Sequence, residues 1–149
     1  RDESRQRIPL RPTAEAMLSI MRTAAMLEHQ VGDVLKPHGI TTTQFNVLRI
    51  LRGFGTTGLC GREVADRLVS QVPDVPRLLE RLEGMGLIAR ERDLEDRRHV
   101  TARITPAGRA LLARVTPEVE SVELTRLAHL DEATLGTIIR GLAAVRQGG

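Results

Sequence analysis

Two adjacent arginines, Arg97 and Arg98, lie beside Asp93 and Asp96 in a short segment that is dense in charge. A guanidinium group is planar and presents its N–H donors as a fork, so it suits phosphate oxygens and base edges better than an ammonium group does. Without further context the segment favours a plainer interpretation, in which acids and arginines pair on a solvated loop. Such surface pairs stabilise a fold by only ~0–1 kcal/mol. The choice between the two depends on the elements that hold the segment.

The composition of the chain excludes several kinds of chemistry. Of the 149 residues, 22 are basic and 19 are acidic, and Lys36 is the single lysine beside 21 arginines. The only aromatic residues are Phe45 and Phe54, so the chain lacks the stacking platforms that bind single-stranded nucleic acid. One cysteine, Cys60, can form neither an intramolecular disulfide nor a C-x-x-C site. The arginine excess has a plain alternative explanation, which is a GC-rich genome that encodes arginine where others encode lysine.

The residue pattern does not predict an enzyme. It contains no Ser/His/Asp or Cys/His arrangement, no glycine-rich phosphate loop and no paired-carboxylate motif, and its four histidines lack metal-ligand spacing. We therefore expect no catalytic residue, no metal site and no cofactor. No apolar segment follows the charged start, and no apolar run approaches the ~18 residues that span a bilayer. These features predict a soluble, cytoplasmic protein of about one domain, without membrane contact.

Apolar spacing predicts the elements around the charged segment. Apolar residues three and four apart predict four helices. The first runs from residue 13 to a stop at 37–39, the second from 42 to a break at Gly53, and the third over 61–69. The fourth follows a turn at 70–73 and ends at about residue 85. Alternation with period two predicts strands over 87–92 and 100–104, which makes the charged segment the tip of a hairpin. Two more helices are expected, one from Pro106 with a kink at Pro117 and one capped by Asp131.

Short motifs fix some of these helices more closely. Thr41 and Gln44 have the spacing of a capping box, in which each side chain satisfies a backbone N–H group of the first turn. The third helix is expected to turn Val64, Ala65 and Leu68 inward. These details, with the order of the elements, predict a mainly α fold with a small β-hairpin, an α+β arrangement.

Two short helices joined by a tight turn and followed by a hairpin form a winged helix-turn-helix. We assign it to residues 41–105. The flanking regions, residues 13–40 and 106–149, are too apolar for their length to stand alone, so they are expected to pack against a partner. Residues 1–12 are predicted to be a flexible arm, which either adds phosphate contacts or stays disordered. The basic residues of this arm are Arg1, Arg5, Arg7 and Arg11.

In this arrangement the sequence resembles the MarR family of bacterial transcription regulators. The similarity is specific from about residue 41 to 112 and looser toward both ends. The residues that carry it are Leu82-Glu83-x-x-Gly86-Leu87-Ile88-x-Arg90, Asp93-x-x-Asp96-Arg97-Arg98 and Ile104-Thr105-x-x-Gly108-x-x-Leu111.

The resemblance implies a homodimer whose terminal helices intertwine. Each subunit would place a recognition helix in the major groove and a wing in the minor groove of a pseudo-palindromic double-stranded DNA site. Many members are repressors that a small phenolic or anionic ligand releases. By resemblance, Arg98 enters the minor groove, where narrow A·T tracts concentrate negative potential. Asp96 would orient that guanidinium, and Arg97 would meet a phosphate.

The fourth helix departs from the family pattern. Pro73 and Pro76 stand where the family commonly has Ser or Thr, and proline is tolerated only in the first turn, so the regular helix is expected to begin near Asp74 or Val75. Arg77 is then the chief donor to bases, for instance to guanine O6 and N7. The prolines also favour an alternative function, a winged-helix interaction or scaffold module with weak or non-specific DNA binding. The expected DNA-binding residues are Arg62, Ser70, Gln71, Pro73, Asp74, Pro76, Arg77, Arg81, Asp96, Arg97 and Arg98.

Two further sites are weaker hypotheses. Cys60 is placed at the N-terminus of the third helix, where a thiol can become a reactive thiolate and act as a redox sensor. The plainer explanation, which the sequence favours, is a small residue that replaces a Ser or Thr cap. An effector pocket is expected, by resemblance, between the dimerisation helices and the second helix. Its candidate residues are Met21, Met26, Phe45 and Arg49.

Overall fold

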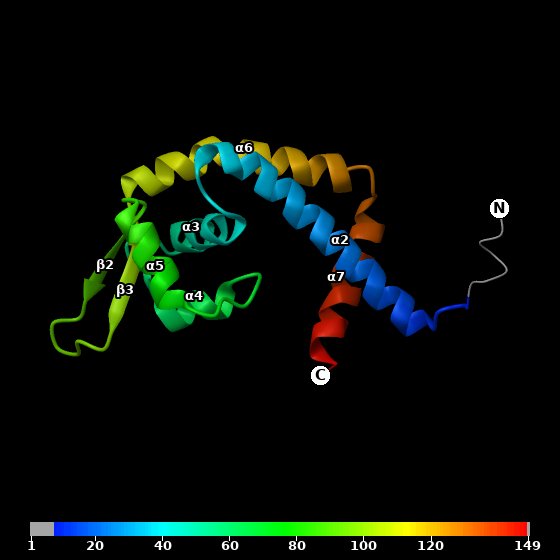
Figure 1. The fold of residues 1–149 in the computed structure, drawn as a ribbon, viewed down its shortest axis with the longest axis horizontal. Helices are drawn as coiled ribbons and strands as arrows, with labels where there is room; N and C mark the ends of the chain where they lie inside the picture. The colour runs from blue at the N-terminus through cyan, green and yellow to red at the C-terminus, as the bar shows by residue number, and fades with distance from the viewer. Residues whose placement is uncertain (1–7, 149) are drawn as a thin grey trace.

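A computed structural model describes residues 8–148, so most of the expected N-terminal arm, including Arg1, Arg5 and Arg7, lies outside the described part. The described helices and strands follow the predicted order, and the chain is mainly helical with a small antiparallel sheet (Figure 1). The elements are α2 (Pro12–Leu35), the 3-10 turn η1 (Lys36–His38), α3 (Thr42–Phe54), β1 (Leu59–Cys60), α4 (Gly61–Arg67), α5 (Val75–Gly84), β2 (Ile88–Arg92), β3 (Val100–Ile104), α6 (Pro106–Leu127) and α7 (Glu132–Gln147).

Local capping defines where several helices begin. Thr41 and Gln44 form the predicted capping box, with the Gln44 N–H donating to Thr41 Oγ1 at 3.1 Å and the Thr41 N–H to Gln44 Oε1 at 3.0 Å. At the start of α6 the Thr105 hydroxyl accepts from the Gly108 N–H at 3.0 Å. A β-carbon at Gly108 would overlap the Leu87 carbonyl, so glycine lets α6 approach the start of the hairpin closely. These motifs fix the ends of the winged-helix unit.

The sheet has three strands in the order β1-β3-β2, and one of them is absent from the sequence prediction. The two hairpin strands pair with Ile88 opposite Ile104, which puts both side chains in the core. The additional strand β1 pairs with β3 through Leu59 opposite Ala102. A strand of two residues has no periodicity to detect, which is why the sequence did not predict it.

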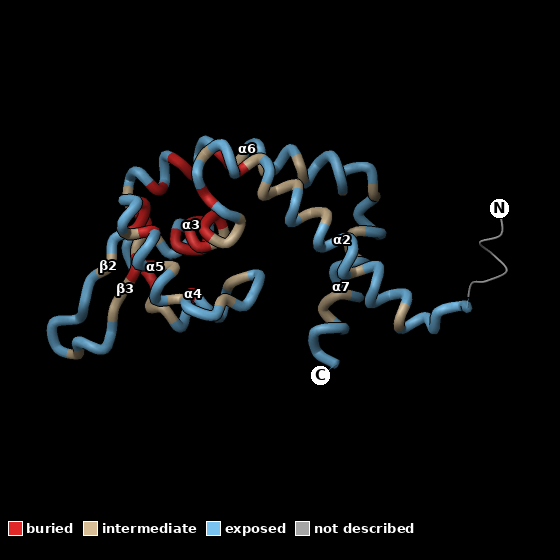
Figure 2. The backbone as a smooth tube through the Cα atoms, viewed as in Figure 1, coloured by how far each residue is buried: buried red, intermediate tan, exposed pale blue. Residues whose placement is uncertain are grey.

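The hydrophobic core lies under α3, α5, the sheet and the first half of α6, as the buried segments in Figure 2 show. Its fully enclosed members include Leu48, Leu82 and Leu112. The other end of the molecule differs: the N-terminal half of α2, the C-terminal half of α6 and α7 carry mostly exposed or half-buried residues (Figure 2). We call this second region the helical extension.

Two sequence expectations about helices are corrected. Ala65 is exposed rather than inward, and α4 ends at Arg67 because the backbone turns extended at Leu68 (φ −70°, ψ 146°). The helix α6 continues through Pro117, and the kink expected there stays a prediction. Pro117 and Ala113, whose carbonyl loses its helical partner, are both exposed, so water can satisfy that carbonyl. Among the described helices, none has the length and apolarity that a membrane span requires.

Candidate nucleic-acid interface

The helix α5 begins where its prolines allow. Asp74 is the N-cap, and its Oδ1 accepts the backbone N–H of Arg77 at 3.0 Å. Pro76 lies in the first turn, where a missing N–H breaks no helical hydrogen bond, and Pro73 precedes the cap. The predicted start near Asp74 or Val75 is therefore confirmed, and Arg77 is the first long polar side chain that the helix presents.

One side of α5 is buried and the other is open to solvent. Leu79 and Leu82 belong to the core, while Arg77, Glu80 and Arg81 are exposed. Ser70 and Gln71 lie in the linker between α4 and α5 and are also exposed. This exposed side, with the linker, forms one half of the surface that the sequence predicts to contact DNA.

The charged segment is the tip of the β2–β3 hairpin, as predicted. Arg98 donates to the same oxygen, Asp96 Oδ1, twice: through its backbone N–H at 3.1 Å and through its side-chain Nε at 3.1 Å. These two bonds with Arg98 hold the pKa of the Asp96 carboxyl below its ordinary value. The Arg98 side chain is nevertheless 91% exposed, so its remaining N–H groups are free to bond a ligand. Asp96 thus orients the guanidinium of Arg98 through its Nε and leaves the other nitrogens uncovered. Arg97, the preceding residue, is also exposed.

A cleft of about 490 Å³ separates α5 from this hairpin. Three arginines and one histidine line it, and among the described residues that line it there is no carboxylate. Three predicted DNA-contacting residues, Arg62, Pro76 and Arg98, meet here, whereas Arg77, Arg81 and Arg97 do not line it. We call this cleft between α5 and the hairpin the basic cleft. The basic residues that line it are Arg62, Arg90, Arg98 and His99.

A contact with two hydrogen bonds to one carboxylate oxygen joins the two halves of this surface. Arg90 on β2 donates through Nε at 3.0 Å and Nη2 at 2.8 Å to Oε1 of Glu83, which is near the end of α5. The sequence pattern predicted no role for Glu83 or Arg90. Both occur in the motif that carries the family resemblance, which was the available signal. The contact ties α5 to β2, the strand that leads to the hairpin tip.

Cys60 also lines the basic cleft and is the N-cap of α4. Its backbone N–H donates to Glu63 Oε1 at 2.9 Å, and hydrogen bonds with Cys60 hold the pKa of Glu63 below its ordinary value. The position fits the capping explanation, and the thiolate hypothesis stays a prediction. Within residues 8–148 no three His, Cys, Asp or Glu side chains are placed to hold a metal ion.

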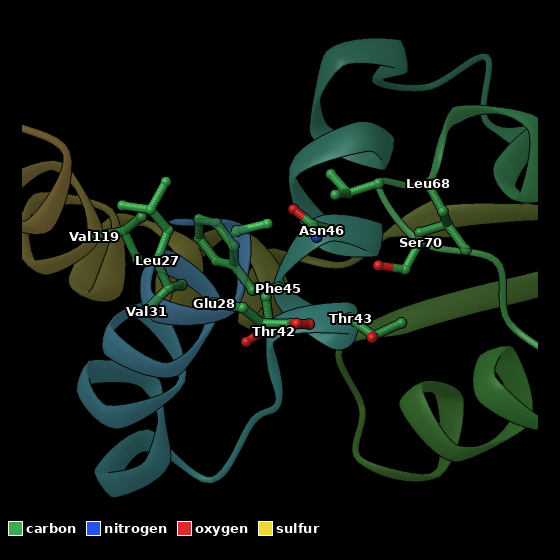
Figure 3. Close-up of a pocket in the computed structure, with 12 residues that line it drawn as sticks. Leu27, Glu28, Val31, Thr42, Thr43, Phe45, Asn46, Leu68, Ser70 and Val119 are labelled. Carbon is green, nitrogen blue, oxygen red and sulfur yellow. The ribbon is translucent and has the colours of Figure 1, made fainter. Parts of the chain in front are cut away.

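A second cavity, of about 510 Å³, lies between α2, α3, α6 and the α4–α5 linker (Figure 3). Of the four expected effector residues, Phe45 lines this cavity, whereas Met21, Met26 and Arg49 do not. Arg49 is exposed, and its Nη2 donates to Asn46 Oδ1 at 3.5 Å. We call this second cavity the linker cavity. Its lining residues are Ala24, Leu27, Glu28, Val31, Thr42, Thr43, Phe45, Asn46, Leu68, Val69, Ser70 and Val119.

The fold and the two-part basic surface define a winged-helix DNA-binding protein, and comparisons with known proteins give its family. The model of the MarR family matches residues 40–100. The HTH-type transcriptional repressor Rv2887 of Mycobacterium tuberculosis is 33% identical over 112 residues, which are 74% of this chain and 78% of the relative. YkoM of Bacillus subtilis, an uncharacterized HTH-type transcriptional regulator, is 33% identical over 90 residues, which are 60% of this chain and 56% of YkoM.

Solved structures agree with this assignment. A MarR transcription factor from Planctomyces limnophilus is 31% identical and superposes with a TM-score of 0.70, covering 93% of this chain and 99% of that one. The S. aureus MepR–DNA complex has the same fold, with a TM-score of 0.81, 22% identity and coverage of 89% and 97%. The chain belongs to the MarR family. It is a DNA-binding transcription regulator.

Proposed function

We propose that this regulator is a homodimeric repressor that binds a pseudo-palindromic DNA site in the cytoplasm and leaves it when a small molecule occupies the linker cavity. The observation that carries the proposal is the basic cleft, flanked by the exposed side of α5 and by the hairpin tip. In this arrangement Arg77 contacts bases in the major groove, and Arg98 enters the minor groove. The name of Rv2887, a repressor, supports repression rather than activation.

Phosphate contacts would hold the protein in register without reading sequence. Arg62 lies at the start of α4, Ser70 and Gln71 in the linker, and Arg97 at the wing tip, all of them exposed. Together they flank the cleft and the recognition helix. Their distribution supports binding through local placement of charge, since the net charge of the chain is only +3.

The helical extension supports the dimer. It leaves large apolar side chains in solvent, among them Met21, which is 60% exposed, and Ile139, which is 64% exposed. Burying apolar surface is favourable by roughly 25 cal/mol per Å², so a second copy that covers these residues would be stabilising. A two-fold dimer also presents two recognition helices, which matches a palindromic site.

The test is a titration of the protein against its own upstream intergenic DNA and against scrambled DNA at several salt concentrations. A regulator of this kind should prefer its site by at least ~10³ and lose affinity steeply with salt. Equal and weak binding to both sequences would contradict the proposal and favour the interaction-module alternative, for which Pro73 and Pro76 are the best argument.

Two variants divide the roles of the arginines. Arg98→Ala should weaken binding to both sequences by a similar factor, because the wing contact reads groove shape and charge. Arg77→Ala should mainly erase the preference between them, at a cost of ~1–3 kcal/mol on the specific site. Fluorescence anisotropy of labelled duplexes measures both, and equal effects of the two variants would refute this division. Arg114→Ala, an exposed arginine on the first half of α6 that does not line the cleft, is the matched control.

A further inference from the structure

We propose that the linker cavity selects a positively charged, largely apolar molecule, with Glu28 as its counter-ion. The inference rests on the proposed function, which makes this cavity the effector site, and it names the chemical class of the effector. It differs from the anionic effector that the family resemblance implies.

The charge of the lining carries the inference. Glu28 is the one charged residue among the described residues that line the cavity. The other polar contributions are the neutral hydroxyls and amide of Thr42, Thr43, Ser70 and Asn46. An anion placed here would meet a carboxylate and no cation, and charge repulsion is stronger beside low-dielectric apolar walls than in bulk water. A cation would be paired instead.

The remaining wall suits an apolar body. Leu27 and Val31 contribute from α2, Phe45 from α3, Val119 from α6 and Leu68 from the linker (Figure 3). A volume of about 510 Å³ is that of a cavity for a drug-sized ligand. Phe45 adds an aromatic ring, which attracts a cation through its quadrupole when the cation lies over its face. The lining therefore complements an organic cation in both shape and charge.

A comparison with the basic cleft sharpens this assignment. The two cavities have nearly equal volumes, about 490 and 510 Å³, but opposite charge. Among the described lining residues the basic cleft has three arginines, one histidine and no acid, and the linker cavity has one acid and no base. The chain thus separates a surface suited to polyanionic DNA from a cavity that disfavours anions.

The cavity also has a direct connection to the recognition helix. Leu68, Val69 and Ser70 line it, and they belong to the linker that leads to Asp74, the N-cap of α5. A molecule held between α2 and this linker contacts the segment that sets where α5 begins. Occupation by a cation is therefore expected to bias the placement of α5 on DNA.

Two probe ions of the same size and shape but opposite charge test the proposal: tetraphenylphosphonium and tetraphenylborate, titrated by calorimetry in potassium-free buffer against the full chain. Glu28→Gln removes the charge and keeps the shape, and Glu123→Gln, an exposed position on α6 outside the cavity, is the matched control. Because Glu28 is an exposed residue, we expect Glu28→Gln to raise the dissociation constant of tetraphenylphosphonium by ~2–5-fold, the size of an exposed ion pair, and not to raise that of tetraphenylborate. Glu28→Arg should reverse the preference between the ions.

Equal effects of Glu28→Gln and Glu123→Gln on tetraphenylphosphonium would overturn the proposal, as would no binding of this cation to the wild-type chain. DNA release is measured separately by anisotropy of a labelled duplex. Binding of the cation through Glu28 with the DNA still bound would support the charge preference and contradict the effector role in the proposed function. Failure of either claim is thus distinguishable from failure of the other.

Discussion

The two ends of this molecule use apolar residues differently. In the winged-helix unit, leucines such as Leu48 and Leu82 are completely enclosed by α3, α5 and the sheet. In the helical extension, Met17 is 57% exposed and Ile139 is 64% exposed, although they occupy well-formed helices. The contrast is visible as a buried cluster at one end of Figure 2 and an open set of helices at the other. The first region buries its apolar surface within one chain, whereas the second leaves it available to a partner.

The helix α6 belongs to both regions, which makes it a natural place to test the comparison. Its first half supplies Leu112, which is 0% exposed, and its second half supplies Leu124, which is 57% exposed. The same residue type on the same helix therefore has opposite surroundings. Any difference between equal substitutions at these positions comes from packing rather than from helix propensity.

Leu112→Ala is expected to have the largest effect, lowering the free energy of unfolding by ~2–5 kcal/mol because it leaves a cavity in the core. Leu124→Ala should change the stability of the isolated chain little, within ~0.5 kcal/mol, and act instead on self-association. Urea denaturation followed by circular dichroism, at protein concentrations low enough to dissociate dimers, measures both. Similar losses for the two variants under these conditions would break the comparison.

Ile139→Asp tests the proposed partner surface. A carboxylate in a dimer interface must be desolvated without a partner, so we expect the dimer dissociation constant to rise ~100-fold, equivalent to about 2.7 kcal/mol. Sedimentation velocity across a dilution series measures it. Ala133→Asp adds the same charge in the first turn of α7, where the helix dipole favours it, and serves as control. A wild-type chain that is monomeric at micromolar concentration would refute the dimer outright.

Glu83→Gln addresses the other region, where the Glu83–Arg90 contact joins α5 to β2. We expect a loss of folding stability near ~1 kcal/mol or less, since both side chains are partly exposed, together with a few-fold loss of DNA affinity. The exchanged pair Glu83→Arg/Arg90→Glu should recover part of the affinity if the contact acts by holding the two elements together. Unchanged DNA affinity in both variants would show that the contact has no positioning role.

Asp131→Asn is expected to have the smallest effect on stability. The pH dependence of that effect shows whether the charge of the cap causes it. The Asp131 Oδ1 accepts the backbone N–H of Thr134 at 2.8 Å. Hydrogen bonds with Thr134 hold the pKa of the Asp131 carboxyl below its ordinary value of 3.8. A carboxyl whose pKa is lowered by folding stabilises the folded state fully above its unfolded pKa, and this contribution is lost as the pH falls through the folded pKa. The melting temperatures of wild type and variant should therefore differ at pH 7 and converge below pH 3.8. A constant difference across that range would exclude the charged cap as its cause.

Much of the winged-helix unit follows from interactions between residues three or four apart. The caps at Thr41, Asp74 and Thr105 each join a side chain to a backbone N–H within one turn, so the sequence alone specifies them. The hairpin and its charged tip follow from alternation and a loop of polar residues. The orientation of Arg98 by Asp96 is likewise a contact across two positions. Local geometry decides these features before any packing occurs.

Other features depend on which distant surfaces meet. The strand β1 exists because Leu59 lies against Ala102. The linker cavity combines Glu28 of α2 with Ser70 of the linker and Val119 of α6, and these residues have no relation in the sequence. This is why three of the four effector residues expected from the sequence do not line it.

The sequence by itself thus determined the order of the elements, their caps and the two arginines at the tip of the wing, because each is encoded within a few residues. The tertiary structure decided the charge of the two cavities and the separation of the enclosed core from the exposed helical extension. The physical reason is that burial and the electrostatic character of a cavity are properties of surfaces brought together by packing, to which residues far apart in the chain contribute equally.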